Sequence, residues 1–321
     1  MTTQYADTLQ QRYSDVCNRV AVAARKAGRK PDQIYLVAVT KHADAEQVKE
    51  LYELGHRDFG ENHVQQLVQR SAILDEYMNR LRLVPTIRRD PTSQSVSLFA
   101  PAPADARAVA GDTRDVRWHM IGHLQRNKAK RAAEISRLIH SVDSLRLAEE
   151  LQLYALKKDV VIEVLVQVNC SGEASKFGCP MPAAIPLCEQ IESMMNIRVR
   201  GLMTMAPYSD HPEDARPAFA RCRELFEEMR REGYGEGRFN LLSMGMSGDF
   251  EVGIAEGANI VRVGTAIFGD ARVGIHDDEP QERPEAPETD EADDARDAAD
   301  DTASDSDADA ERDSSEGRVR D

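Results

Sequence analysis

The sequence lacks the residue patterns that mark secreted, metal-binding and membrane proteins. Its N-terminus, MTTQYADTLQQRYSDV, is polar and has no apolar core of a signal peptide. No segment approaches the ~20 consecutive apolar residues that a membrane span requires. The cysteines are odd in number and show no CxxC or Cys/His spacing of a metal site; they are Cys17, Cys170, Cys179, Cys188 and Cys222. We therefore expect a cytoplasmic protein with reduced thiols, no bound metal and no membrane association.

The C-terminal segment lacks the apolar residues that a folded domain needs. Residues 276–321 contain 20 acidic residues and 5 arginines, which accounts for the whole net charge of −15. The segment has no aromatic residue and almost no aliphatic side chain larger than alanine, so it cannot bury enough surface to offset the entropy of folding. We predict that 273–321 is a disordered acidic tail. The rest of the chain is formally neutral, which argues against nucleic-acid binding.

A glycine-rich nucleotide-binding fingerprint is also missing, and its absence bears on the fold. Short apolar runs alternate with amphipathic helical segments, and the runs begin at Ile34, Arg57, Arg117, Leu138, Val161, Arg198, Asn240 and Asn259. Eight strand–helix units in ~250 residues predict an α/β fold, a single (β/α)8 TIM-type barrel. An open doubly wound sheet is the alternative. Its glycine motif would follow the first strand, where this chain reads TKHADA.

Two further segments do not follow this alternation. Apolar residues repeat at helical spacing from about Tyr5 to Ala27, before a stop at Gly28, and predict an extra N-terminal helix. Residues 82–115 are rich in Pro, Ala, Ser, Asp and Arg. A loop of this length in a compact domain is normally functional or disordered. We interpret it as a disordered insertion in a barrel domain that spans residues 1–272.

The first predicted strand, which begins at Ile34, is closed by a long cationic side chain, that of Lys41. The carboxyl ends of the strands form the active face of such barrels. Burial at this position would favour the uncharged, nucleophilic amine, which suits Schiff-base formation with a carbonyl. The alternative is a lysine whose ammonium group reaches solvent as the strand ends.

The segments after the seventh and eighth predicted strands offer anion-binding groups. Ser247 is predicted to be a helix N-cap with Asp249 in the first turn, and free amides at a helix N-terminus bind anions. The eighth strand ends in Gly264, which lets backbone amides approach an anion, and Thr265, which adds a hydroxyl donor. Phosphate sites recur in barrels after strands seven and eight. An ordinary cap and an ordinary turn are the alternative interpretation.

A lysine and a phosphate site together point to pyridoxal 5′-phosphate (PLP), an aldehyde that needs both anchors. Arg262 lies two residues before Gly264, so the two residues share a face of the strand, which would be the barrel interior. A buried arginine needs an acceptor. The unprotonated nitrogen of the pyridine ring would serve, and a salt bridge to a carboxylate is the alternative.

These residues stand in motifs that resemble those of the pyridoxal phosphate homeostasis proteins, also called the proline synthase co-transcribed family. The matching stretches run in family order: LVAVTKHADAEQV, DFGENHVQQ, WHMIGHLQRNK, HSVDS, VLVQVNCSGEASKFG, VRGLMTMAP, LSMGMSGDFEVGIAEG and VRVGTAIFG. Members of that family fold as one barrel related to the N-terminal domain of alanine racemase.

The resemblance implies a role for each candidate residue. Lys41 would form the covalent PLP aldimine, and Arg262 would face the ring nitrogen. The phosphate would be held by Ser247, Gly264 and Thr265. Asn62 would contact the cofactor, with a helix N-cap as its alternative role. His119 lies in a family motif, but we interpret it as a hydrogen-bonded core histidine.

Three functions compete. In the first, the chain holds PLP for buffering or delivery to apo PLP-dependent enzymes, without strong turnover. In the second, it is a fold-type III racemase-like enzyme. Racemisation needs a proton donor or acceptor on each face of the carbanion, and here Lys41 would act alone unless Tyr208 or a histidine served. A Schiff-base aldolase is the third function, but it leaves Arg262 without a purpose. We favour the carrier, as a monomer.

Overall fold

Eight parallel strands close into a barrel, as the alternation of strand and helix predicts. The computed structural model describes residues 8–83, 116–173 and 176–269. In barrel order the strands are β1 (Tyr35–Val39), β2 (Asp58–Glu61), β3 (Arg117–Met120), β4 (Ser136–Val142), β5 (Ile162–Asn169), β7 (Ile197–Met203), β8 (Leu241–Ser243) and β9 (Ile260–Val263). Pairing of β4 with β5 and of β1 with β9 closes the ring. Each of the eight predicted runs overlaps one of these strands, so the predicted (β/α)8 barrel is confirmed.

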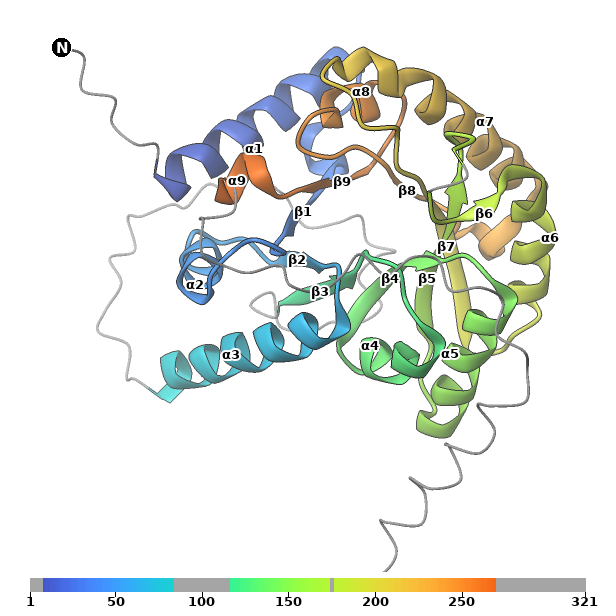
Figure 1. Cartoon of the computed structure of the whole chain (residues 1–321), viewed down its shortest axis with the longest axis horizontal. Coiled ribbons are helices and arrows are strands. Elements are labelled where there is room, and N and C mark those ends of the chain that lie inside the picture. Colours follow the sequence, from blue (N-terminus) through green and yellow to red (C-terminus); the bar gives the residue numbers. More distant parts are fainter. Residues whose placement is uncertain (1–7, 84–115, 174–175, 270–321) are drawn as a thin grey trace, which may run out of the picture. The chain divides into compact units, whose positions relative to one another are not determined.

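Helices surround the barrel and connect its strands (Figure 1). They are α2 (Ala45–Glu53), α3 (Val64–Leu83), α4 (Ala129–Ile135), α5 (Leu145–Lys158), α6 (Met181–Glu192), α7 (Arg216–Glu232), α8 (Phe250–Ala255) and α9 (Thr265–Phe268). A short strand, β6 (Cys179–Pro180), pairs with the end of β5 outside the ring. Among the described helices, none combines the length and the apolarity that crossing a membrane requires.

The predicted extra N-terminal helix is present as α1 (Leu9–Lys26). It begins later than Tyr5 because Thr8 caps it: the Thr8 hydroxyl accepts from the backbone N–H of Gln11, whose side chain returns the bond to Thr8. The chain leaves the helix at Gly28, which adopts a positive φ of 69°. Helix α1 packs against α8 and α9 and so joins the two ends of the barrel domain.

The two predicted disordered segments lie almost wholly outside the described residues. Arg82 and Leu83, which we placed in the insertion, belong to the last turn of α3. Residues 84–115 and 270–321 are not described, so the insertion, the acidic tail and the domain boundary at 272 stay predictions.

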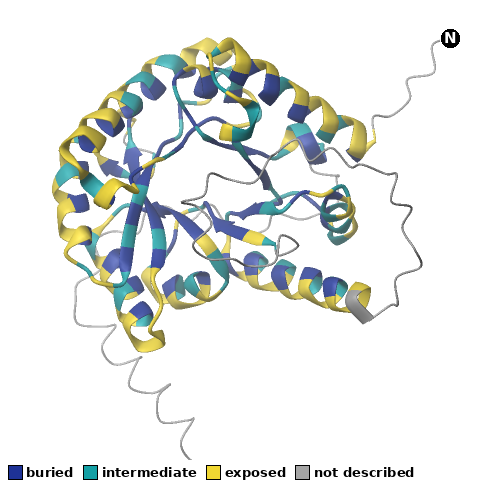
Figure 2. Cartoon of the chain, turned by 180° about the vertical axis from the view of Figure 1, so that it is seen from behind, coloured by how far each residue is buried: buried dark blue, intermediate teal, exposed yellow. Residues whose placement is uncertain are grey.

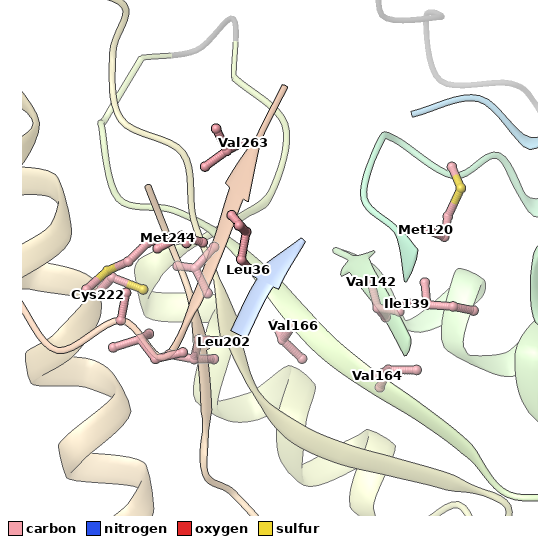
Figure 3. Packing of buried hydrophobic residues seen from close by; sticks show 14 of the residues in the cluster. Leu36, Met120, Ile139, Val142, Val164, Val166, Leu202, Cys222, Met244 and Val263 are labelled. Carbon is pink, nitrogen blue, oxygen red and sulfur yellow. The ribbon is translucent and has the colours of Figure 1, made fainter. Parts of the chain in front are cut away.

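Alternation along the strands divides the core into two layers. Leu36 and Ala38 of β1 face outward into the large cluster between strands and helices, whereas Val37 faces the barrel interior with Leu165 and Met203. Figure 2 shows the buried residues on the strands and on the inner faces of the helices. Figure 3 shows part of the outer layer, in which strand residues such as Val263 share one cluster with Cys222 of α7. Each fully buried aliphatic side chain contributes roughly 1.5–3 kcal/mol, so the outer layer holds the helices in place.

A neutral histidine is buried where α1 meets β2. His56 is 4% exposed, and its Nε2–H donates to the carbonyl of Asp58 at 2.7 Å. Its Nδ1 therefore accepts the hydroxyl of Tyr13, at 3.2 Å. Burial lowers the pKa of His56 to about 4.

We predict that His56 makes the domain less stable as the pH falls from 7 to 5. The unfolded chain takes up a proton at His56 below its ordinary pKa of ~6.5, whereas the folded chain does so only near pH 4. In that window His56 alone contributes up to ~1.4 kcal/mol per pH unit. Urea unfolding at several pH values should therefore give a shallower slope for His56→Gln than for wild type. The exposed His211→Gln control should keep the wild-type slope, and equal slopes in both variants would contradict the assignment.

Candidate functional site

Lys41 lies in the turn that follows β1, beside the carboxyl end of the barrel. The strand ends at Val39, two residues earlier than predicted, and the Thr40 N–H still follows the sheet by donating to Gly60 at 3.0 Å. Lys41 is half-buried. Within the described part of the chain its ammonium group has no hydrogen-bond or ion-pair partner. The Lys41 side chain is thus at the predicted end of the barrel and unpaired among the described residues.

Arg70 of α3 holds the backbone of this turn. Its Nη2 donates to the carbonyls of Ala43 (2.8 Å) and Lys41 (3.4 Å), and its Nη1 donates to the carbonyl of Thr40. The same Nη1 pairs with Glu61, which is fully buried at the end of β2. Arg70 was not among the predicted site residues, because an arginine on an amphipathic helix is typical of the protein surface. These contacts fix the backbone position of Lys41.

The pairing of β1 with β9 brings the second half of the predicted site beside Lys41. Ala38 and Val263 are register partners, so the turn after β1 and the turn after β9 leave the barrel side by side. Gly264 packs closely on β1, since a Cβ at this position would lie 3.2 Å from the carbonyl oxygen of Val39. A side chain here would press on the Val39 carbonyl and require a shift of a few tenths of an ångström, so glycine suits this close approach.

Ser247 occupies a different position from the one predicted, but it belongs to the same turn region. The predicted N-cap is wrong: helix α8 begins at Phe250, Asp249 takes the cap position, and its carboxylate accepts the Met246 N–H at 2.6 Å. Ser247 instead reaches the end of β9. Its Oγ accepts from the N–H groups of Gly264 (3.2 Å) and Ala266 (3.4 Å).

The turn after β9 therefore gathers several donors at one point. Two backbone N–H groups point at the Ser247 hydroxyl there, and Thr265 begins α9 with an exposed side chain. These are the groups that phosphate oxygens require.

Arg262 lies inside the barrel, as its spacing from Gly264 predicts. It is 3% exposed, and it donates to Ser243 Oγ at 2.5 Å and to the carbonyl of Thr204 at 2.9 Å. Burial lowers the pKa of Arg262 to about 10. Within the described residues it has no salt bridge, the alternative that the sequence left open. A guanidinium has five N–H donors, so three remain for another acceptor.

Asn62 lies in the segment between β2 and α3 and is half-buried. Helix α3 begins at Val64, which places His63 rather than Asn62 next to its first residue, so the N-cap alternative does not hold. A Cβ at Gly122 would lie 2.1 Å from the Asn62 carbonyl oxygen, so the turn after β3 packs directly on this backbone. Position and packing thus keep Asn62 on the same face of the barrel as Lys41.

The remaining candidates separate into core and surface residues. His119 is 6% exposed and hydrogen-bonded to His140 and Asp58, which confirms the prediction of a core histidine. Tyr208, the alternative base for a racemase, is 91% exposed in the loop after β7. The groups that the structure brings together are an unpaired lysine, a turn with N–H and hydroxyl groups, and a buried guanidinium. Their chemistry fits a phosphorylated aldehyde with an aromatic nitrogen.

Comparison with known proteins decides the family. Residues 16–272 match the family model of the alanine racemase N-terminal domain. The pyridoxal phosphate homeostasis protein of Aquifex aeolicus (strain VF5) is 35% identical over 266 residues, which cover 82% of this chain and 98% of the relative. That of Pseudomonas aeruginosa is 34% identical, over 82% of this chain and 95% of the relative. The chain belongs to the pyridoxal phosphate homeostasis protein family.

Solved structures place this family member among barrels of the same kind. PipY of Synechococcus elongatus PCC7942, solved with PLP bound, matches with a TM-score of 0.58 and 29% identity over 79% of this chain and all of PipY. An alanine racemase from Corynebacterium glutamicum matches with a TM-score of 0.51 and 14% identity, over 81% of this chain and 62% of the racemase. The latter likeness is one of fold alone. The predicted family and its relation to alanine racemase are thus both confirmed.

We predict that Arg70→Gln strongly destabilises this domain. The change leaves Glu61, which is fully buried, without its charged partner, and removal of one member of a buried pair costs roughly 3–5 kcal/mol. Arg80→Gln is the matched control, since Arg80 lies on the same helix and pairs with Glu76 at the surface. An exposed pair of this kind contributes ~0.5 kcal/mol. Urea unfolding at pH 7 compares the two, and equal losses would show that Arg70 is an ordinary surface residue.

Proposed function

We propose that this chain binds PLP covalently through Lys41 and holds it as a reserve for other proteins. The observation that supports this proposal most directly is the pairing of β1 with β9. It brings the turn with Lys41 beside the turn in which the N–H groups of Gly264 and Ala266 donate to Ser247. Its membership of the pyridoxal phosphate homeostasis protein family supports the assignment. So does PipY, a relative 29% identical whose structure holds PLP.

Each residue has a role that follows from its chemistry. PLP supplies an aldehyde that an amine captures reversibly, with loss of water. Lys41 supplies that amine, and the Arg70 contacts fix its starting point. The phosphate is bound by Ser247, Gly264 and Thr265, through amide and hydroxyl donors. For Asn62, in the segment after β2, only the family resemblance supplies a role, which is contact with the cofactor.

Arg262 bears on the choice between a carrier and an enzyme. Its guanidinium remains charged at ordinary pH and offers only donors, so an aromatic nitrogen that accepts from it stays unprotonated. An unprotonated ring withdraws electrons less strongly and stabilises a carbanion less well. Racemisation also needs a second acid–base group, and Tyr208 is exposed to solvent. Both observations favour a carrier over a racemase-like enzyme.

The cellular setting of the carrier follows from the same chemistry. Reversible capture through Lys41 allows release of PLP to apo PLP-dependent enzymes, which we propose as its recipients. All five thiols are free and buried, and this supports the cytoplasmic location that we expect. We propose that the chain acts as a monomer.

We predict that borohydride reduction of the PLP-treated protein labels Lys41. Reduction fixes the bond between its Nζ and the aldehyde carbon, and peptide mapping by mass spectrometry identifies the lysine. The visible absorbance of the bound cofactor should disappear in Lys41→Ala. It should persist in Lys26→Ala, a control at an exposed position of α1. Labelling of another lysine, or of none, would overturn the proposal.

The carrier and the enzyme are separated by a turnover assay on the same preparation. The PLP-loaded protein should convert L-alanine to D-alanine at most very slowly, because the site offers one acid–base group where two are needed. Steady formation of D-alanine at ordinary enzyme rates of ~1 per second or more would favour the racemase.

A further inference from the structure

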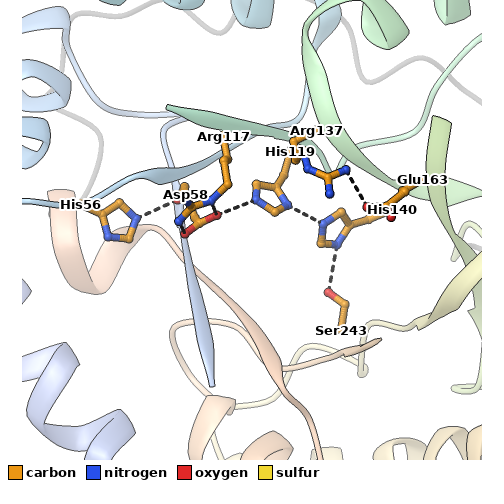
Figure 4. Close-up of polar contacts among 8 residues, drawn as sticks. All are labelled: His56, Asp58, Arg117, His119, Arg137, His140, Glu163 and Ser243. Atoms are coloured by element: carbon orange, nitrogen blue, oxygen red, sulfur yellow. Dashed lines mark hydrogen bonds and ion pairs between the residues drawn. The ribbon is translucent and has the colours of Figure 1, made fainter. Parts of the chain in front are cut away.

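A line of polar side chains crosses the barrel interior and ends on Arg262 (Figure 4 shows all but Arg262). Asp58 Oδ1 lies 3.2 Å from His119 Nε2, and His119 Nδ1 lies 3.0 Å from His140 Nε2. His140 Nδ1 lies 3.0 Å from Ser243 Oγ, which accepts from Arg262 at 2.5 Å. We refer to Asp58, His119, His140 and Ser243 as the relay.

Three relay residues, His119, His140 and Ser243, are buried in an otherwise apolar interior, and Asp58 at its end is half-buried. His140 and Ser243 are fully buried and His119 is 6% exposed, while Val37, Leu165 and Met203 fill the same interior. A buried polar group without a partner costs roughly 1–3 kcal/mol. Every ring nitrogen of the two histidines has a partner, so the network is complete.

With both histidine rings neutral, the acceptor-only carboxylate of Asp58 determines the direction of every hydrogen bond in the relay. Arg262 can only donate, so Ser243 Oγ accepts from it with one lone pair, and the single Ser243 proton goes to the bare Nδ1 of His140. Neutral His140 then carries its proton on Nε2 and donates to His119 Nδ1. His119 in turn donates from Nε2 to the carboxylate of Asp58, which only accepts.

Charges at both ends support this direction. Burial alone would raise the pKa of Asp58, but hydrogen bonds from Arg117 and His119 hold it well below its usual value. Arg117 binds both carboxylate oxygens of Asp58, at 2.7 and 2.5 Å, where β2 and β3 begin. Burial, with the nearby His119 and Arg262, lowers the pKa of His140 well below its usual value, which keeps its ring neutral.

We propose that the relay residues are positioning residues for Arg262. Within the relay, the Ser243 hydroxyl donates its proton to His140. A lone pair of Ser243 Oγ therefore faces the guanidinium of Arg262 and holds it in one orientation. The three remaining N–H donors of Arg262 are thereby fixed toward the acceptor that it meets at the carboxyl end of the barrel. The direction of the relay stands on geometry alone, and the identity of that acceptor, the ring nitrogen of PLP, rests on the proposed function.

The first test reads the histidine protons directly. In two-bond 1H–15N spectra of histidine-labelled protein without cofactor at pH 7, His119 and His140 should both be neutral, with Nε2 protonated and Nδ1 bare. Ser243→Ala removes the donor to His140 Nδ1, so that resonance should move, which also identifies it. Ser141→Ala is the matched control, since Ser141 is a neighbouring buried serine whose hydroxyl has no partner among the described residues. A proton on Nδ1 of either ring, or on both nitrogens, would overturn the proposed direction.

The second test reads the effect on bound PLP. Ser243→Ala should weaken PLP binding about tenfold and shift its visible absorption, because Arg262 loses its fixed orientation. Reduction should still label Lys41, and Ser141→Ala should match wild type in all three measurements. Unchanged affinity and absorption in Ser243→Ala would overturn the positioning role. Wild-type protein that shows no PLP band would overturn the proposed function instead, and the histidine spectra would still decide the direction of the relay.

Discussion

The site depends on the pairing of the first strand of the barrel with the last. Ala38 and Val263 are register partners, so the turn with Lys41 and the turn that begins at Gly264 emerge at the same edge. Parallel pairing puts the carboxyl ends of all strands on one face, and closure of the barrel makes the first and the last strand neighbours. The turn with Lys41 and the turn that begins at Gly264 come from opposite ends of the barrel domain, so they meet only when the two strands pair. The glycine at 264 is what permits the close contact with Val39.

The interior of the barrel combines an apolar filling with a fully paired polar line. Val37, Leu165 and Met203 form the apolar cluster of the interior, and a chain of hydrogen bonds links Arg262 to Asp58. Such a line is tolerated because every member has a partner and both ends carry a full charge. The apolar side chains of the interior thus add to stability, and we propose that the polar line orients Arg262.

The predictions that rest on local, periodic patterns of apolar residues are confirmed. All eight strands and the extra helix follow from apolar runs and caps, and alternation placed Arg262 in the interior. Predictions were wrong or missing where a side chain forms its hydrogen bonds with a distant segment of the chain. Ser247 looked like a cap for α8, but it bonds to the end of β9, 17 residues away. Arg70 and the relay were missed because their partners lie on other strands, and Asn62 came from family resemblance alone.

The contact of α1 with the C-terminal end of the barrel bears on how the protein is made. Arg12 donates to the carbonyls of Ile267 (2.8 Å) and Phe268 (3.3 Å), so the first helix completes its contacts with the last residues of the domain. A nascent chain that has not yet released β9 from the ribosome leaves the edges of β1 and β8 unpaired. The ring of strands therefore closes only after β9 has left the ribosome, and a product truncated before β9 would carry open strand edges that favour aggregation.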